Sequence, residues 1–366
     1  MLKVDMIVGV RPDFIQASAL NQTFSEHTDK LNVRIIHTGE QNDPELSQIH
    51  IEQLNLQPIA AYLPVETGDS TRQLAEIIVS YDLQLKSDKP DLVLIMGNST
   101  SALACAIVAA RNGVKIAHID AGVRYYNQAL VQEQNDLMID QLATYLFTAN
   151  PESAINLIRE GFDTVRILEV GNLRSDTVFM NLGFAEDSNI LDRYGLNPDA
   201  YVVVYIHQEH ILSDTNYLIS LFTLFEELSE GAKIHVILDP QTSMLLEDTP
   251  EIILDSTDNL QFVSSHNYHD MLKLIKNATL VITDSQGVQE ETTQLGVQCL
   301  TVGNEMNRPV TFSVGTNTLA GFDISEIRTN ILSILSGETK EASPIDLWDG
   351  KVGQRIADFI SSTDIA

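Results

Sequence analysis

The 366-residue sequence is poor in cysteine, and this scarcity excludes two kinds of structure. Its two cysteines, Cys105 and Cys299, lie far apart in apolar surroundings, and neither has a second cysteine or a histidine at the spacing of a metal site. A disulfide framework and a zinc site are therefore excluded. We expect buried, reduced thiols, no metal and a cytoplasmic location.

Positive charge and long hydrophobic runs are also scarce. Lysine and arginine number 22 against 51 aspartate and glutamate residues, which gives a formal net charge of −29 at pH 7. Such a surface repels nucleic-acid phosphates and anionic lipid. No stretch approaches the roughly 20 apolar residues of a membrane span, and the first apolar stretch, interrupted by Asp5, is too short for a signal peptide. We expect no nucleic-acid partner and no membrane insertion.

Short runs rich in valine and isoleucine are plentiful, and they alternate with longer amphipathic segments. This alternation predicts parallel β-sheets covered by helices on both faces. The predicted strands form two series, 2–8, 33–37, 92–96, 114–118, 146–148 and 165–169, and then 202–206, 234–238, 261–263, 280–283 and 299–302. The expected fold class is α/β, with two doubly wound, Rossmann-like domains at 1–175 and 176–350. Residues 351–366 are predicted to form a terminal helix that packs back on the N-terminal domain.

Ligands of open α/β sheets bind beyond the carboxyl ends of the strands, so the loops after the predicted strands are the places to search. The loop from Gly9 to Asp13 offers close backbone approach, a helix amino terminus and Arg11, which suits a phosphate or carboxylate. A surface arginine in a connector is the alternative. After another strand, Ser99 or Thr100 is expected at a helix N-cap with Asn98 projecting into the crevice, and capping is a sufficient explanation for this segment.

A third loop, His118 to Arg124, places an imidazole, a carboxylate and a guanidinium within seven residues. This density favours acid–base chemistry by Asp120, with a structural Asp–Arg pair as the alternative. Gln132 and Glu133 then open a predicted helix whose first turn points toward the same place. Complementing the helix dipole is the simpler explanation for Glu133.

In the second half, the segment from His207 to His210 follows a strand, and its spacing matches no zinc motif. The segment from Thr283 to Glu291 carries the stronger signal, because it runs from strand through turn to helix. The amides of Ser285 and Gly287 would lie at the helix amino terminus, where they suit a phosphate. Glu291 lies one turn further, where a carboxylate can bind both hydroxyls of a ribose.

In order and content, these motifs resemble those of the non-hydrolysing UDP-N-acetylglucosamine 2-epimerases of bacterial envelope biosynthesis, over nearly the whole chain. The matching segments are Gly9 to Asp13 with G-T-R-P-E, His37-Thr38-Gly39 with H-T-G, Gly97-Asn98-Ser99 with G-D-T, His118 to Arg124 with H-V-E-A-G-L-R, Gln132 to Asn135 with E-E-x-N, Gly171-Asn172 with G-N, His207 with the histidine of H-R-R-E-N, Asp284 to Glu291 with D-S-G-G-x-Q-E-E, and Arg308-Pro309 with R-P.

The resemblance implies a GT-B fold, in which two Rossmann-like domains face each other across a cleft, the N-terminal one on the sugar side and the C-terminal one on the UDP side. The implied UDP-binding residues are Arg11, Asp13, Ser285, Gln286, Gly287, Glu291 and Arg308. Ser285 to Gly287 would hold the diphosphate and Glu291 the ribose. The implied reaction interconverts UDP-GlcNAc and UDP-ManNAc by elimination and re-addition of UDP, for envelope polysaccharide precursors. It needs no cofactor, and the resemblance implies a homodimer.

The departures from the family's motifs fall on the chemistry. Of three carboxylates around the sugar, the first is Asn98 here, the second is the shorter Asp120, and the third aligns with Gln132 unless Glu133 takes its place. An amide orients a sugar but exchanges no proton near neutral pH.

The predicted acid–base set is therefore Asp120, Glu133 and His207, with Asn98 and Gln132 as orienting groups. Two alternatives stay open. One is a catalytically silent paralogue that binds a UDP-sugar as a subunit or regulator, and the other is a GT-B glycosyltransferase.

Overall fold

The computed structural model describes residues 1–39, 51–65, 69–247, 249, 255–304, 306 and 308–365. The chain forms two compact units: unit 1 comprises Met1–Met180 with Asp346–Ala366, and unit 2 comprises Asn181–Ile345. The sequence placed these boundaries at 175/176 and 350/351. The first of these, like the crossing after Met180, lies inside helix α7 (Leu173–Glu186).

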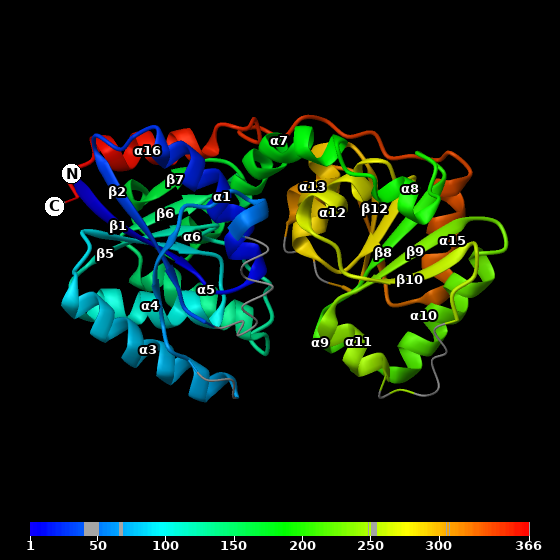
Figure 1. Ribbon diagram of the computed structural model, residues 1–366, viewed down its shortest axis with the longest axis horizontal. Helices are drawn as coiled ribbons and strands as arrows, with labels where there is room; N and C mark the ends of the chain where they lie inside the picture. Colours follow the sequence, from blue (N-terminus) through cyan, green and yellow to red (C-terminus); the bar gives the residue numbers. More distant parts are fainter. Residues whose placement is uncertain are drawn as a thin grey trace. The chain divides into compact units, whose positions relative to one another are not determined.

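Unit 1 is built on a parallel sheet with the strand order β3-β2-β1-β4-β5-β6-β7 (Figure 1). Its strands are β1 (Leu2–Val8), β2 (Leu31–His37), β3 (Ile59–Tyr62), β4 (Leu92–Met96), β5 (Lys115–Ile119), β6 (Tyr145–Thr148) and β7 (Ile167–Glu169). The order reverses direction between β1 and β4. This reversal is the switch point of a doubly wound sheet, where the loops after neighbouring strands diverge and leave room for a ligand.

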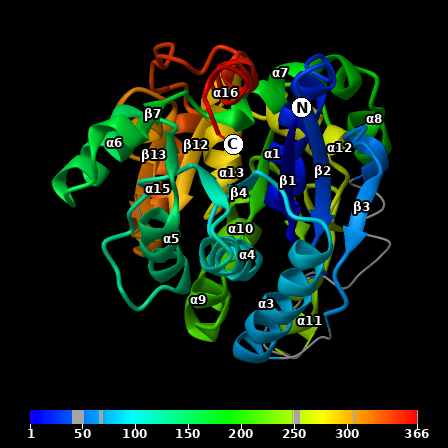
Figure 2. The same ribbon diagram turned by 90° about the vertical axis from the view of Figure 1, so that its left-hand side faces the viewer.

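Helices cover both faces of this sheet (Figures 1 and 2). On one face lie α1 (Arg11–Ser25) and α16 (Val352–Ser362), and on the other lie α3 (Ser70–Ser87), α4 (Thr100–Arg111) and α5 (Val131–Leu142). The crossover from β6 to β7 contains α6 (Pro151–Arg159) and a short 3-10 turn at Thr164–Arg166. As predicted, Ser99 caps α4: its hydroxyl accepts the backbone N–H of Ala102 at 3.1 Å.

The last helix, α16, belongs to unit 1 although it is far from the rest of the unit in sequence. The backbone N–H of Gly353 donates to the Asp176 carboxylate at 2.8 Å, and the indole N–H of Trp348 donates to the carbonyl of Ala149 at 3.1 Å. The Phe359 ring packs edge-on against two aromatic rings of β6. Buried aromatic area and satisfied backbone groups together attach the end of the chain to the sheet.

Unit 2 repeats the architecture with the strand order β10-β9-β8-β11-β12-β13. Its strands are β8 (Tyr201–Tyr205), β9 (Lys233–Leu238), β10 (Leu260–Ser264), β11 (Leu280–Thr283), β12 (Gln298–Val302) and β13 (Asn317–Gly321). One apolar cluster packs α10 (Thr215–Leu228) and α15 (Ile324–Leu335) on the sheet, and another packs α8 (Ile190–Tyr194), α12 (Tyr268–Lys276) and α13 (Gln286–Leu295). Short helices α9 (Glu209–Leu212), α11 (Pro240–Glu247) and α14 (Pro309–Ser313) lie in the connections.

The two Rossmann-like parallel sheets confirm the predicted fold class. The sequence missed β3 and β13, which are edge strands. In β3 partly buried residues alternate with exposed ones, so the continuous apolar run that marks a central strand is absent. Among the described residues, no helix is long and apolar enough to span a membrane.

We expect Gly171→Ala to destabilise unit 1 by roughly 2–5 kcal/mol. Gly171 has φ +93°, and a Cβ there would meet the carbonyl oxygen of Leu347 at 2.1 Å. Urea unfolding followed by fluorescence of the single tryptophan, Trp348, measures the effect next to the substituted residue. The control is Gly183→Ala, at a position in α7 with nothing within 4 Å of the added carbon, which should stabilise by about 0.5–1 kcal/mol. Equal stability of Gly171→Ala and wild type would contradict the close approach of the two segments.

Candidate functional site

The predicted site residues of unit 1 lie in the first turn of α1, which follows β1, in the loops after β4 and β5, and in the first turn of α5. In the first turn of α1, the Asp13 carboxylate accepts the backbone N–H groups of Gly9 at 2.9 Å and Val10 at 3.1 Å. Asp13 is buried and Arg11 is half-buried. Asp13 therefore shapes the loop that presents Arg11.

Asp120 combines burial with an unusual backbone. Its φ of +65° is in the left-handed region, which costs a non-glycine residue about 1 kcal/mol or more. Its Oδ2 accepts a hydrogen bond from the Gln16 side-chain amide at 2.8 Å. The donor in this hydrogen bond is a neutral amide.

His118 is fully buried, and both of its ring nitrogens face acceptors. Nδ1 lies 2.7 Å from an Asp140 carboxylate oxygen and Nε2 lies 2.9 Å from the carbonyl of Gly97. Each nitrogen must carry a proton to make its bond, so His118 is an imidazolium. Burial acts to lower the pKa of His118, but the hydrogen bond and charge of Asp140, with the charge of Asp136, raise it.

Arg124 completes this buried network. Its Nη2 lies 2.7 Å from Asp140, and its Nε and Nη2 donate to the two oxygens of Glu160 at 2.7 and 2.6 Å. Burial acts to raise the pKa of Asp140, but His118 and Arg124 hold it below its usual value. The structural Asp–Arg pair that the sequence left open for Asp120 is thus formed by Arg124 with Asp140.

Asn98 lies against a second carboxylate of α5. Its amide Nδ2 donates to Asp136 Oδ2 at 2.7 Å and to the Tyr125 hydroxyl at 3.3 Å. Asp136 is 1% exposed. Burial raises the pKa of Asp136 to about 7, the charge of Asp140 adds to the rise, and His118, Asn98 and Arg124 oppose it. A carboxyl that titrates near neutrality is thus in contact with Asn98.

Gln132 and Glu133 lie on different faces of α5. Gln132 is exposed, whereas Glu133 is 4% exposed, and its Oε2 accepts the backbone N–H of Tyr125 at 2.6 Å. Glu133 shares its helix face with Asp136 and Asp140, three and seven residues further on. Glu133 is therefore buried on the face of α5 that carries Asp136, and Gln132 is exposed.

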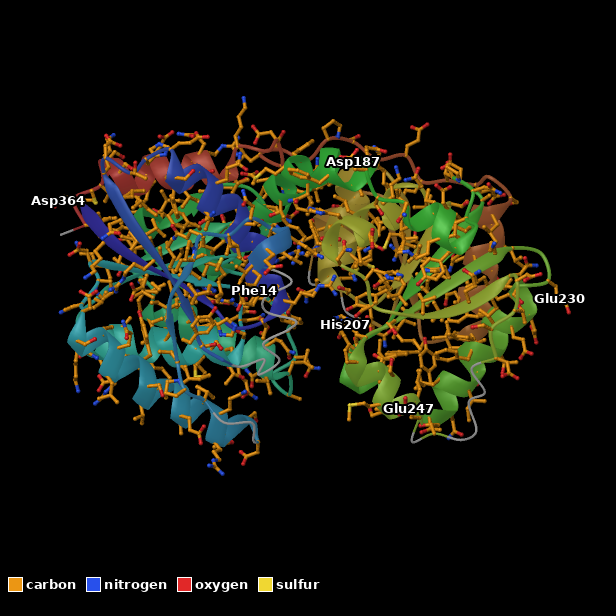
Figure 3. The ribbon with its side chains drawn as sticks, in the orientation of Figure 1. Phe14, Asp187, His207, Glu230, Glu247 and Asp364 are labelled. Atoms are coloured by element: carbon orange, nitrogen blue, oxygen red, sulfur yellow. The ribbon has the colours of Figure 1, made fainter. Side chains whose placement is uncertain are left out.

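In unit 2 the centre of the predicted site is Asp284, at the carboxyl end of β11. Its carboxylate accepts the backbone N–H of His207 at 3.0 Å and that of Gln208 at 2.8 Å, and it lies 2.8 Å from His207 Nδ1. The ring of His207, labelled in Figure 3, stacks on Tyr205 at 5.1 Å. A carboxylate on Nδ1 fixes the tautomer and orientation of the imidazole, as in many catalytic histidines.

The amino terminus of α13 departs in one detail from the prediction. The amide of Ser285, which the sequence suggested for a phosphate, donates to the Thr283 hydroxyl at 3.0 Å. The helix itself begins at Gln286, so the amide of Gly287 lies in its first turn, where helix amides are suited to an anion. Arg308 is buried and its Nε donates to Glu290 at 2.5 Å.

Three contacting residues escaped the reading of the sequence, namely Asp136, Asp140 and Tyr125. The two aspartates are four residues apart on an amphipathic helix, in positions where one face should be apolar. The signal available in the sequence was two aspartates at positions of the helix that are expected to be buried. Among the side chains that the structure describes, no three His, Cys, Asp or Glu residues gather as a metal site, and those of Glu209 and His210 lie outside this set.

The chain is similar to known proteins over nearly its whole length. The family model described as UDP-N-acetylglucosamine 2-epimerase matches residues 24–361. A UDP-N-acetylglucosamine 2-epimerase of Methanococcus maripaludis is 29% identical over 366 residues, covering 98% of both chains. A second protein of that organism, a UDP-N-acetylglucosamine 2-epimerase homolog, is 31% identical over 333 residues, covering 90% of this chain and 92% of its own.

Solved structures agree with these sequence matches. The crystal structure of Methanocaldococcus jannaschii UDP-GlcNAc 2-epimerase in complex with UDP-GlcNAc and UDP superimposes with a TM-score of 0.91 at 28% identity. The match covers 99% of this chain and 100% of that one. The similarity therefore includes both Rossmann-like units.

We expect the stability that Asp136 contributes to unit 1 to fall as the pH rises. A carboxyl whose pKa is raised on folding contributes fully below its unfolded pKa of about 4, and the contribution is lost as the pH rises through 7. A rise to about 7 corresponds to roughly 4 kcal/mol. In urea titrations, wild-type stability minus that of Asp136→Asn should fall by about 2–4 kcal/mol between pH 5 and pH 8.

The matched control is Asp82→Asn on α3. Asp82 also accepts a hydrogen bond from an asparagine, Asn112 at 3.1 Å, but its pKa is lowered, chiefly by hydrogen bonds from Lys86 and Asn112. Wild-type stability minus that of Asp82→Asn should therefore not fall between pH 5 and pH 8. A flat difference for Asp136→Asn would contradict the raised pKa.

Proposed function

The chain belongs to the UDP-N-acetylglucosamine 2-epimerase family, and on that premise we propose that it is an isomerase interconverting UDP-GlcNAc and UDP-ManNAc. The observation that carries the proposal is the buried carboxylate of Asp120, held in a left-handed backbone at the carboxyl end of β5. A carboxylate built into such a position is suited to remove a proton from carbon. The product would supply cell-envelope polysaccharide precursors.

The UDP moiety is assigned mainly to unit 2. Gln286 and Gly287, at the amino terminus of α13, and the Ser285 side chain bind the diphosphate, because first-turn amides and the helix dipole favour an anion. The buried carboxylate of Glu291, one turn further, binds the two ribose hydroxyls. Arg308 supports this helix through its bond to Glu290. From unit 1, Arg11 contributes positive charge to the phosphates, and Asp13 holds its loop.

The proposed reaction divides into two steps that mirror each other. Asp120 takes the proton from C2, the electron pair of the C–H bond forms a C1–C2 double bond, and the C1–O bond breaks with its electrons going to UDP. Glu133 then returns a proton to the other face of C2, while an oxygen of UDP attacks C1. His207, oriented through Nδ1 by Asp284, presents Nε2 to the departing diphosphate. No step is assigned to the exposed Gln132.

The two alternatives from the sequence have less support. A silent paralogue would keep the nucleotide site of unit 2 and lose the acid–base groups, yet Asp120 and Glu133 are both present and buried. A GT-B glycosyltransferase would share the fold, but the family match extends over residues 24–361 and names an epimerase. The homodimer and the cytoplasmic location stay predictions.

We expect the protein to exchange the C2 proton of UDP-GlcNAc in heavy water and to form UDP-ManNAc, followed by proton NMR. Asp120→Asn should slow exchange by about 10²–10⁴-fold, because it removes the base and keeps the shape. UDP binding by this variant is the control for folding, and it should be unchanged. Unchanged exchange in Asp120→Asn would remove Asp120 from the mechanism. Broadened uracil signals without exchange in the wild type would favour the silent paralogue.

For the nucleotide site, Glu291→Gln should weaken UDP binding about tenfold, because a carboxylate accepts hydroxyl donors more strongly than an amide does. Calorimetric titration measures the dissociation constant, and the rise in melting temperature with UDP gives a second readout. The matched control is Glu230→Gln, an exposed residue of unit 2 that lies at the other end of the unit from His207 (Figure 3). Equal UDP affinity in both variants would overturn the assignment of the ribose to Glu291.

A further inference from the structure

The Asn98 side chain offers a ligand only one of its two polar atoms. Its Nδ2 carries two hydrogens and has two acceptors, Asp136 Oδ2 at 2.7 Å and the Tyr125 hydroxyl at 3.3 Å. The backbone carbonyl of Asn98 accepts the Asn135 side-chain amide at 2.8 Å, so the main chain of the residue is held as well. The remaining group of this half-buried side chain is the Oδ1 carbonyl, which is an acceptor.

Asp136 is in a position to control this orientation, because of the charges packed around it. His118 on β5 and Arg124 in the loop after it each carry a positive charge. Asp140 lies one helical turn after Asp136 on α5 and carries a negative charge. Glu160 is paired with Arg124. These four groups balance one another, so ionised Asp136 adds a negative charge in excess of the network, and the amide N–H of Asn98 is the donor that faces it.

We propose that Asp136 is a positioning residue that turns Oδ1 of Asn98 toward the substrate, so that Asn98 binds an N–H or O–H donor of the hexosamine ring. This inference rests on the proposed function and extends it to the recognition of the sugar. In this inference Asn98 accepts a hydrogen bond from the sugar, as a carboxylate would, but it transfers no proton. The acid–base work stays with Asp120 and Glu133.

The same pair predicts a dependence on pH. Above pH 7, Asp136 is mainly ionised and accepts only, so it requires the N–H side of the amide. Below pH 7, the protonated carboxyl donates its proton, and the carbonyl of an amide turned by 180° accepts it. Affinity for UDP-GlcNAc should therefore increase as the pH rises from 6 to 8. The Asn98–Asp136 pair should not change the affinity for UDP alone, because UDP has no sugar.

The test compares the dissociation constants of UDP-GlcNAc and of UDP by calorimetry at pH 6 and pH 8. Asp136→Asn should weaken UDP-GlcNAc about five- to tenfold at pH 8 and leave UDP within twofold, because UDP lacks the sugar. For this variant, the ratio of the UDP-GlcNAc and UDP dissociation constants should be the same at pH 6 and pH 8. The swapped pair, Asn98→Asp with Asp136→Asn, moves the carboxylate to position 98 and keeps the hydrogen bond, so it should restore UDP-GlcNAc to within twofold of wild type.

Asp82→Asn is the matched control. Asp82 on α3 also accepts a hydrogen bond from an asparagine, Asn112 at the end of α4. This variant should leave both constants unchanged. Unchanged UDP-GlcNAc binding in Asp136→Asn overturns the inference alone, and so does an equal loss of UDP binding, which indicates a structural role. A wild-type protein that binds neither ligand overturns the proposed function itself.

Discussion

The geometry of unit 1 depends on one buried ion pair, between the imidazolium of His118 and the carboxylate of Asp140. Through its other nitrogen, His118 holds the carbonyl of Gly97, directly before Asn98. Through its other oxygen, Asp140 accepts the backbone N–H of Gly122, two residues after Asp120. One pair between β5 and α5 thus fixes the loops that carry Asn98 and Asp120. Breaking such a pair typically costs about 3–5 kcal/mol, because it leaves a buried charge without a partner.

Two carboxylates of this region are paired with side-chain amides. Gln16 donates to Asp120 at 2.8 Å, and Asn98 donates to Asp136 at 2.7 Å. A side-chain amide is a neutral donor, so neither of these hydrogen bonds brings a positive charge to the carboxylate. This differs from Asp140, whose charge is neutralised by His118 and Arg124 and which is held ionised. The same residue type therefore has two functions, decided by whether its partner is charged.

Unit 2 uses a carboxylate in a third way. Asp284 accepts two backbone N–H groups and the ring nitrogen of His207, which places the histidine at the start of the β8–α9 connection. The backbone bonds and the ring bond come from the same segment, so the orientation of the imidazole is set by the loop as a whole. In both units, a buried aspartate positions a group from a neighbouring loop.

The sequence by itself determined the α/β class, the central strands and the family. Buried parallel strands require continuous apolar runs, and the loops after them carried motifs in a recognisable order from Gly9 to Arg308. The edge strands β3 and β13 were beyond its reach, because a half-covered strand leaves no continuous apolar run. Only the tertiary structure decided that Glu133 is buried on the face of α5 that carries Asp136, and that Asp136 contacts Asn98, 38 residues away. A hydrogen bond depends on distance and direction, which the order of residues along the chain does not contain.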